Sequence, residues 1–181
     1  MMQLQIQNMG RKLVPMQLLW DKTVGNGMEK VNAFESKDSK LLVAEQPMVD
    51  EKGIPYKDLY VAGIDSIDMG TSDSASTTDV SDFCIIIKKR VFGLEEPRIV
   101  AMYKDRPKDI RMAYDVAIKL CTWYNCKAML EYTRISIIQY FTEKKKQHLF
   151  MSRPAWAVGG ASNSRASKQA SSSSLYANVT S

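Results

Sequence analysis

The hydrophobic pattern of residues 59–151 changes its period in a fixed order, and this order restricts the fold more than any other feature. Three apolar or alternating segments come first, at 59–65, 83–92 and 98–104, with breaks rich in Gly, Pro, Ser, Thr and Asp. Such runs, bounded by such residues, predict β-strands. A hairpin-like connection, GLEE, joins the last two segments, and three consecutive strands suggest an antiparallel meander.

The period then becomes helical. Between residues 110 and 124 the apolar side chains recur at steps of three and four, which gives one apolar stripe along a helix. A short strand centred on 128–130 follows, then a second helix over 134–146 and a fifth strand over 148–151. The element order is therefore β-β-β-α-β-α-β.

A helical crossover between neighbouring strands requires a parallel pair, so this order implies a mixed sheet with right-handed connections and helices packed on its faces. The order is that of the ribonuclease H-like fold. We therefore predict an α/β protein with a mixed five-stranded sheet and flanking helices, incomplete at its C-terminus. The predicted domain spans 40–156, after a poorly defined segment at 1–39 and before a Ser-rich, disordered tail at 157–181.

Two of the predicted strands end on a carboxylate. The first is apolar over 59–64, apart from Gly63, and stops at Asp65; the strand after the first helix stops at Glu131. Charge is costly to desolvate, so a carboxylate at the end of a buried strand needs a reason. The predicted topology makes these strands neighbours and places Asp65 beside Glu131. A Mg²⁺ or Mn²⁺ ion would relieve their repulsion, because hard cations prefer oxygen ligands.

This placement suggests a reaction. Two divalent ions about 3.5–4 Å apart can activate a water and stabilise the leaving oxygen during attack on a phosphodiester. We predict hydrolysis of this kind, with Asp65 as the bridging ligand and Glu131 completing one ion site. Asp68 and Asp82 are secondary candidates for metal binding. Each of these carboxylates also has an ordinary explanation as a solvated turn or strand-end residue.

The basic residues allow a polyanionic partner without requiring one. The net charge of +5 fits DNA binding and equally fits a solubilising surface. Arg134, at the start of the second helix, could face a DNA phosphate, and Lys104 and Arg106 lie in the basic segment KDRPKDIR. Each of the three is also explained as a surface residue.

Other classes of protein are disfavoured by composition. No stretch approaches the roughly 20 apolar residues of a membrane helix, and the first residues lack the apolar block of a secretory signal. We therefore expect a soluble intracellular protein. Three cysteines and one histidine, without a close CxxC pair, do not form a zinc motif.

Three blocks of the sequence resemble the nuclease domain of tailed-bacteriophage large terminases: LYVAGIDSIDMGTSDSASTTDVSDFCIIIKKR, MYKDRPKDIR and CKAMLEYTRISIIQYF. The resemblance covers 40–153. It implies a ribonuclease H or RuvC-type endonuclease that cuts concatemeric double-stranded viral DNA during genome packaging in the host cytoplasm, using Mg²⁺ or Mn²⁺. In this pattern the first aspartate corresponds to Asp65 and the acidic residue of the fourth strand to Glu131, while Asp68 and Asp82 match auxiliary positions. The implied partners are an ATPase domain, the small terminase and the portal.

The sequence departs from that family in two respects. It contains no GxxxxGK[ST] motif, so we expect no ATP site in this chain. The family also supplies a third metal-binding aspartate from a later helix, whereas residues 154–181 contain no Asp or Glu. We therefore predict a truncated nuclease domain with a weakened second ion site. The alternatives are a catalytically silent DNA- or partner-binding fragment, and a related resolvase or transposase nuclease.

Overall fold

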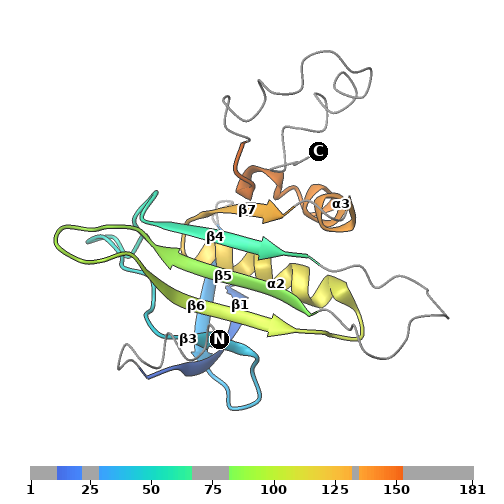
Figure 1. The fold of residues 1–181 in the computed structure, drawn as a ribbon, viewed down its shortest axis with the longest axis horizontal. Coiled ribbons are helices and arrows are strands. Elements are labelled where there is room, and N and C mark those ends of the chain that lie inside the picture. The colour runs from blue at the N-terminus through green and yellow to red at the C-terminus, as the bar shows by residue number, and fades with distance from the viewer. Residues whose placement is uncertain (1–11, 22–28, 67–81, 132–134, 153–181) are drawn as a thin grey trace.

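The computed structural model describes residues 12–21, 29–66, 82–131 and 135–152, which form a mixed α/β protein (Figure 1). They contain one seven-stranded mixed sheet, two α-helices and a short 3₁₀ helix. The elements are β1 (Val14–Asp21), β2 (Lys30–Glu35), β3 (Leu41–Val43), β4 (Tyr60–Asp65), β5 (Phe83–Lys89), β6 (Arg98–Asp105), α2 (Ile110–Trp123), β7 (Lys127–Glu131), α3 (Ile135–Glu143) and η1 (Gln147–Leu149).

The strands lie in the order β2-β1-β3-β6-β5-β4-β7. β4, β5 and β6 form the predicted antiparallel meander, and β7 pairs with β4 in parallel, as a crossover through α2 requires. The predicted α/β class and mixed sheet are confirmed. The predicted strand count is corrected from five to seven. Four of the predicted strands are found, as β4, β5, β6 and β7, and β1, β2 and β3 add three more to the same sheet.

The strand predicted over 148–151 is also corrected. Residues Gln147–Leu149 form the 3₁₀ helix η1, and only Phe150 makes a parallel bridge to Ala128, where the Met151 amide donates to the Ala128 carbonyl at 2.8 Å. The apolar side chains of this segment pack against the core and do not mark a strand. The Phe150 ring stacks on Phe141 of α3, with 4.4 Å between centroids.

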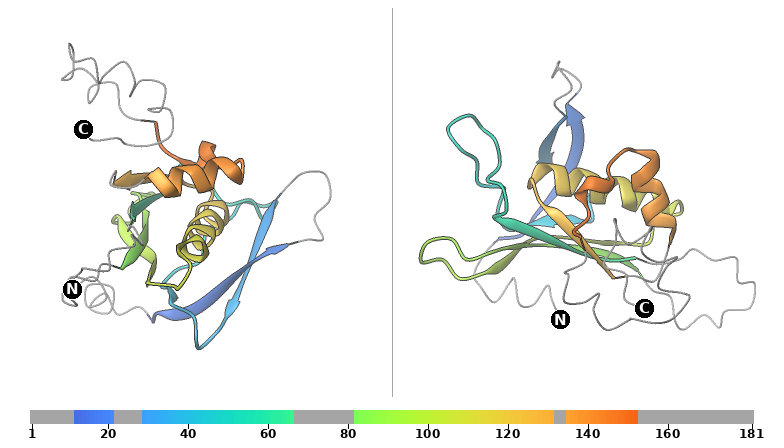
Figure 2. Two further views of the ribbon diagram at one scale, coloured as in Figure 1. Left: turned by 90° about the vertical axis from the view of Figure 1, so that its right-hand side faces the viewer. Right: turned by 90° about the horizontal axis from the view of Figure 1, so that it is seen from above.

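Helix α2 lies between the β4–β7 part of the sheet and the β1–β2 ribbon, which folds over its far side (Figure 2). Its side chains at the predicted three- and four-residue spacing are buried, and Tyr114 packs edge-on against Phe83 at 5.8 Å. Asp109 caps its first turn by accepting a hydrogen bond from the Arg111 amide. Neither α2 nor α3 is long and apolar enough to cross a membrane.

Both α-helices lie on the same side of β4, β5 and β7 (Figure 2). Along β4, Tyr60, Ala62 and Ile64 face this side and are buried, whereas the alternate positions face the other side. No described helix covers that other side. We call it the open face of the sheet, and it carries the carboxylates discussed below.

The two α-helices end in the same way. After α2, Asn125 adopts a φ of 48°, and the Cys126 amide donates to the Cys121 carbonyl. After α3, Lys145 adopts a φ of 57°, and the Lys146 amide donates to the Phe141 carbonyl. This is the Schellman arrangement, in which the left-handed position favours Gly and tolerates Asn better than Lys.

Lys145→Gly is therefore expected to stabilise the protein by about 1 kcal/mol, because glycine has no Cβ to strain at this φ. The measurement is the midpoint of urea unfolding at unchanged slope. Asn125→Gly is the matched control. It should give no such gain, because it removes the 2.9 Å hydrogen bond from Asn125 Nδ2 to the Pro55 carbonyl. A lower midpoint for Lys145→Gly would contradict the assignment of strain.

Candidate functional site

Asp65 and Glu131 are the last residues of β4 and β7, and they are direct partners in the parallel register. Adjacent strands lie about 4.8 Å apart, and paired residues of a parallel ladder project to the same face. The residues before them, Ile64 and Leu130, are buried on the helix side, whereas both carboxylates are exposed. The predicted neighbouring placement is therefore found, and β4 and β7 run side by side in Figure 1.

The same row of the sheet extends over two further strands. Cys84 of β5 pairs with Asp65, and Lys104 of β6 pairs with Cys84. Cys84 is half-buried and Lys104 exposed, and their chain neighbours Phe83 and Tyr103 are buried on the helix side. Lys104, Cys84, Asp65 and Glu131 thus form a row across the open face, which we call the edge row.

Burial and neighbouring charges together change the pKa of the Cys84 thiol. Burial is the main cause that raises the pKa of Cys84, and the negative charge of Asp65 raises it further. Lys104 opposes these effects, and Asp82 adds a smaller increase. Three charged groups from three strands or strand ends therefore lie close enough to one thiol to influence its pKa.

Asp82 joins this site from the chain just before β5. Its Oδ2 lies 3.3 Å from Lys104 Nζ, and the side chains are 36% and 61% exposed. Arg106 follows the end of β6, where its amide donates to Asp105 Oδ1. Two of the predicted basic residues, Lys104 and Arg106, thus lie at the same end of the sheet as Asp65.

Two predicted residues, Asp68 and Arg134, lie outside the described residues. Sequence reasoning missed Cys84 of the edge row, and it missed the ion pair between Asp82 and Lys104. The alternation in FCIII separates Cys84 from its buried neighbours Phe83 and Ile85, but only the strand register shows that it faces Asp65.

The carboxylate oxygens of Asp65 and Glu131 are the metal-binding atoms that the candidate site offers to a divalent ion. Within the part of the chain that the structure describes, no group of three or more His, Cys, Asp or Glu side chains is arranged to hold a metal. Mg²⁺ is often bound by only one or two carboxylates, with waters and substrate phosphate oxygens at its other positions. The oxygen donors of Asp65 and Glu131, on one exposed face, fit that form of binding.

No family model matches the sequence, and no curated protein is significantly similar to it. The resemblance of the three sequence blocks to large terminases therefore stays a prediction.

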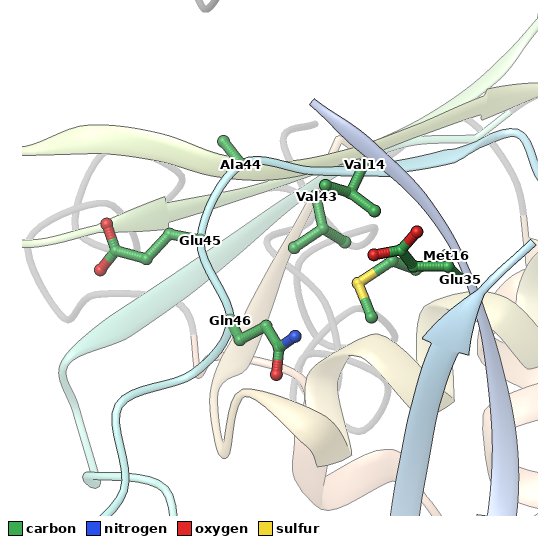
Figure 3. A pocket seen from close by; sticks show the side chains of 7 residues that line it. All are labelled: Val14, Met16, Glu35, Val43, Ala44, Glu45 and Gln46. Carbon is green, nitrogen blue, oxygen red and sulfur yellow. The ribbon is translucent and has the colours of Figure 1, made fainter. Parts of the chain in front are cut away.

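A pocket of about 160 Å³ lies elsewhere in the sheet, among β1, β2, β3 and the segment after β3 (Figure 3). β6 and β5 separate β3 from β4 and the carboxylates. Glu45 lines this pocket, and its carboxylate forms ion pairs with Lys89 at 2.8 Å and with Arg98 at 2.7 Å. The pocket is lined by Val14, Met16, Glu35, Val43, Ala44, Glu45 and Gln46. We therefore place the candidate site at the edge row and not in this pocket.

Proposed function

We propose that this protein is a metal-dependent DNA endonuclease domain of the large-terminase kind, hydrolysing phosphodiester bonds of double-stranded viral DNA during packaging. The observation that carries the proposal is the in-register pairing of Asp65 with Glu131 at the ends of two parallel strands. A divalent cation bound between these two side chains would be coordinated by carboxylate oxygens, the ligands that hard cations prefer. The site then has affinity for an ion that phosphodiester hydrolysis requires.

We also propose that the fold is ribonuclease H-like. The β4-β5-β6 meander, the crossover through α2, the parallel strand β7 and the following α3 agree with that order. β1, β2 and β3 are then additions to the four strands of that order, and β1 and β2 contact α2 on its far side.

The residues have separate roles in this mechanism. Asp65 is held between two paired strands, β5 and β7, so its backbone is fixed and its carboxylate is well placed as the principal ligand. Glu131, on the next strand, completes the pair. When bound there, Mg²⁺ or Mn²⁺ would activate a water and neutralise charge on the phosphate. Lys104 and Arg106 lie where they can contact the phosphates of a bound DNA strand.

The metal dependence of DNA cutting tests the proposal. We expect the protein to nick supercoiled plasmid in Mn²⁺ and, more slowly, in Mg²⁺, and to be inactive in excess chelator. The control is Asp65→Ala, prepared in parallel to exclude a contaminating nuclease. Robust cutting by Asp65→Ala would refute the site assignment, as would cutting that persists in chelator.

A second candidate function is a catalytically silent DNA-binding module. It is favoured by the finding that, among the described residues, the two paired carboxylates are not joined by a third preformed ligand. This candidate predicts DNA binding, measured by fluorescence anisotropy, without any metal-dependent cleavage. The nicking and binding assays together separate the two candidates.

A further inference from the structure

Six of the eleven large apolar side chains that are exposed among the described residues belong to two short connections of the chain. One connection, 49–56, precedes β4, and the other, 91–94, joins β5 to β6. Both project from the same end of the sheet (Figure 2). Single exposed apolar residues are ordinary, whereas a concentration of them marks an interaction surface. We call these six side chains the tip patch: Val49, Ile54, Tyr56, Val91, Phe92 and Leu94.

Hydrogen bonds hold both connections in a fixed shape. In the first, Asp50 Oδ1 accepts hydrogen bonds from the amides of Lys52 and Ile54, each at 2.9 Å. In the second, the Glu95 amide donates to the Phe92 carbonyl at 3.0 Å and closes a tight turn. A surface that is ordered before it binds loses little conformational entropy on association. The tip patch is therefore suited to binding a partner without rearrangement.

The two connections meet at a pair of aromatic rings. The ring centroids of Tyr56 and Phe92 lie 5.9 Å apart, and the two side chains are 40% and 42% exposed. Beyond them, Leu94 at the turn is fully exposed. Aromatic and aliphatic side chains of this kind supply most of the binding energy when the centre of an interface is desolvated. The contact between the rings joins the two connections into one surface.

The charges around the tip patch indicate which kind of partner it fits. Besides Glu95, which is paired with Lys89 and Arg98, segments 49–58 and 90–96 carry three cations and four anions. So even a balance gives no net attraction for DNA or for an anionic lipid surface. It fits a protein surface that also presents both signs. The charged residues are Lys52, Lys57, Arg90, Asp50, Glu51, Asp58 and Glu96.

We propose that the tip patch of one molecule binds the tip patch of a second copy in a two-fold symmetric dimer. In such a contact the same surface is used twice, so cations around one patch meet anions around the other. The six side chains amount to several hundred Å² of apolar surface per molecule. This is the size range of a weak, reversible interface, in which each partner buries less than about 600 Å².

The proposed interface lies at the far end of β4 and β5 from the edge row. Tyr60 pairs with Lys89 next to the tip patch, whereas Asp65 pairs with Cys84 in the edge row. Five residues of extended strand separate Tyr60 from Asp65, a distance of roughly 17 Å. Dimerisation therefore leaves the edge row of both copies exposed, and it does not depend on the proposed nuclease activity.

Sedimentation velocity of the full chain, from about 1 to 200 µM, tests the proposal. We expect the average mass to rise with concentration from the 20.5 kDa of one chain towards twice that value. Leu94→Asp should raise the dissociation constant at least about tenfold, because it places an unpaired charge in the apolar contact. Leu94 is fully exposed in the single chain, so folding should be unaffected, which circular dichroism checks.

Met112→Asp is the matched control, since Met112 is 61% exposed on α2 and lies outside the tip patch. It introduces the same charge and should leave the dissociation constant unchanged. Equal weakening by both variants would show a general effect of charge and overturn the interface. A chain that stays monomeric at the highest concentration would also overturn it, and binding to phosphatidylcholine vesicles would then identify a lipid surface as the occupant. A mass that rises beyond two chains would contradict the two-fold symmetric contact.

Discussion

Replacing Asp65 with Asn is expected to reduce Mn²⁺-dependent nicking by at least about 100-fold, since a bound ion contributes several kcal/mol of transition-state stabilisation. The change keeps the shape of the side chain and removes its charge. Asp65 is exposed at the end of β4, so the free energy of unfolding should change by no more than about 0.5 kcal/mol. The loss would therefore report on chemistry and not on folding.

The control is Glu96→Gln, which removes the same charge from the exposed connection between β5 and β6. It should nick plasmid at the rate of the unchanged protein. Glu131→Gln should also be impaired, because Glu131 is the register partner of Asp65. DNA binding by Asp65→Asn should be retained or slightly tightened, since a negative charge near the phosphates is lost. An active Asp65→Asn protein would remove the basis of the proposed mechanism.

The elements from β4 to α3 were predictable because their hydrophobic periods are long and regular. The buried positions of α2, such as Ala113, Ala117 and Leu120, follow the helical spacing visible in the sequence. β1 and β2 were not predictable in the same way. Only Met16 and Leu18 of β1 and Val31 of β2 are fully buried, so the alternating signal is too short to specify a strand pair.

The candidate site was predictable only in part. Asp65 and Glu131 each end an apolar strand, and strand order alone brings them together. The Asp82–Lys104 pair depends on the register between β5 and β6, in which Cys84 faces Lys104. A shift of one residue would turn Lys104 to the other face, and hydrophobic periodicity does not determine register to that accuracy from one strand alone.

The run of charges Lys88-Lys89-Arg90 shows a second limit of sequence reasoning. All three residues look like surface cations, yet the Lys89 side chain is only 1% exposed. It faces the helix side of the sheet, because β5 alternates through Ile85, Ile87 and Lys89. Its Nζ donates to Glu45 at 2.8 Å and to Glu95 at 2.7 Å. Arg98 donates to the same two carboxylates, so the four residues form a neutral network.

Lys89→Met is therefore expected to lower the free energy of unfolding by about 2–4 kcal/mol, near the lower part of the range for a broken buried pair. Methionine retains most of the side-chain volume, so the loss comes from charge and not from a cavity. Arg98 still neutralises part of Glu45, and Glu95 is half exposed, which limits the cost. Urea unfolding followed by circular dichroism measures the difference, and Lys88→Met should change it by less than about 0.5 kcal/mol.

The effect of Lys89→Met should also depend on pH. Hydrogen bonds from Lys89, and then from Arg98, lower the pKa of Glu95 below its ordinary value of 4.5. A carboxyl with a lowered folded-state pKa contributes its full stability above the unfolded value and loses it as pH falls through the folded value. The stability difference between the native sequence and Lys89→Met should thus be constant near pH 7 and narrow below pH 4.5. A difference that stays unchanged in acid would show that packing, and not the ion network, gives Lys89 its role.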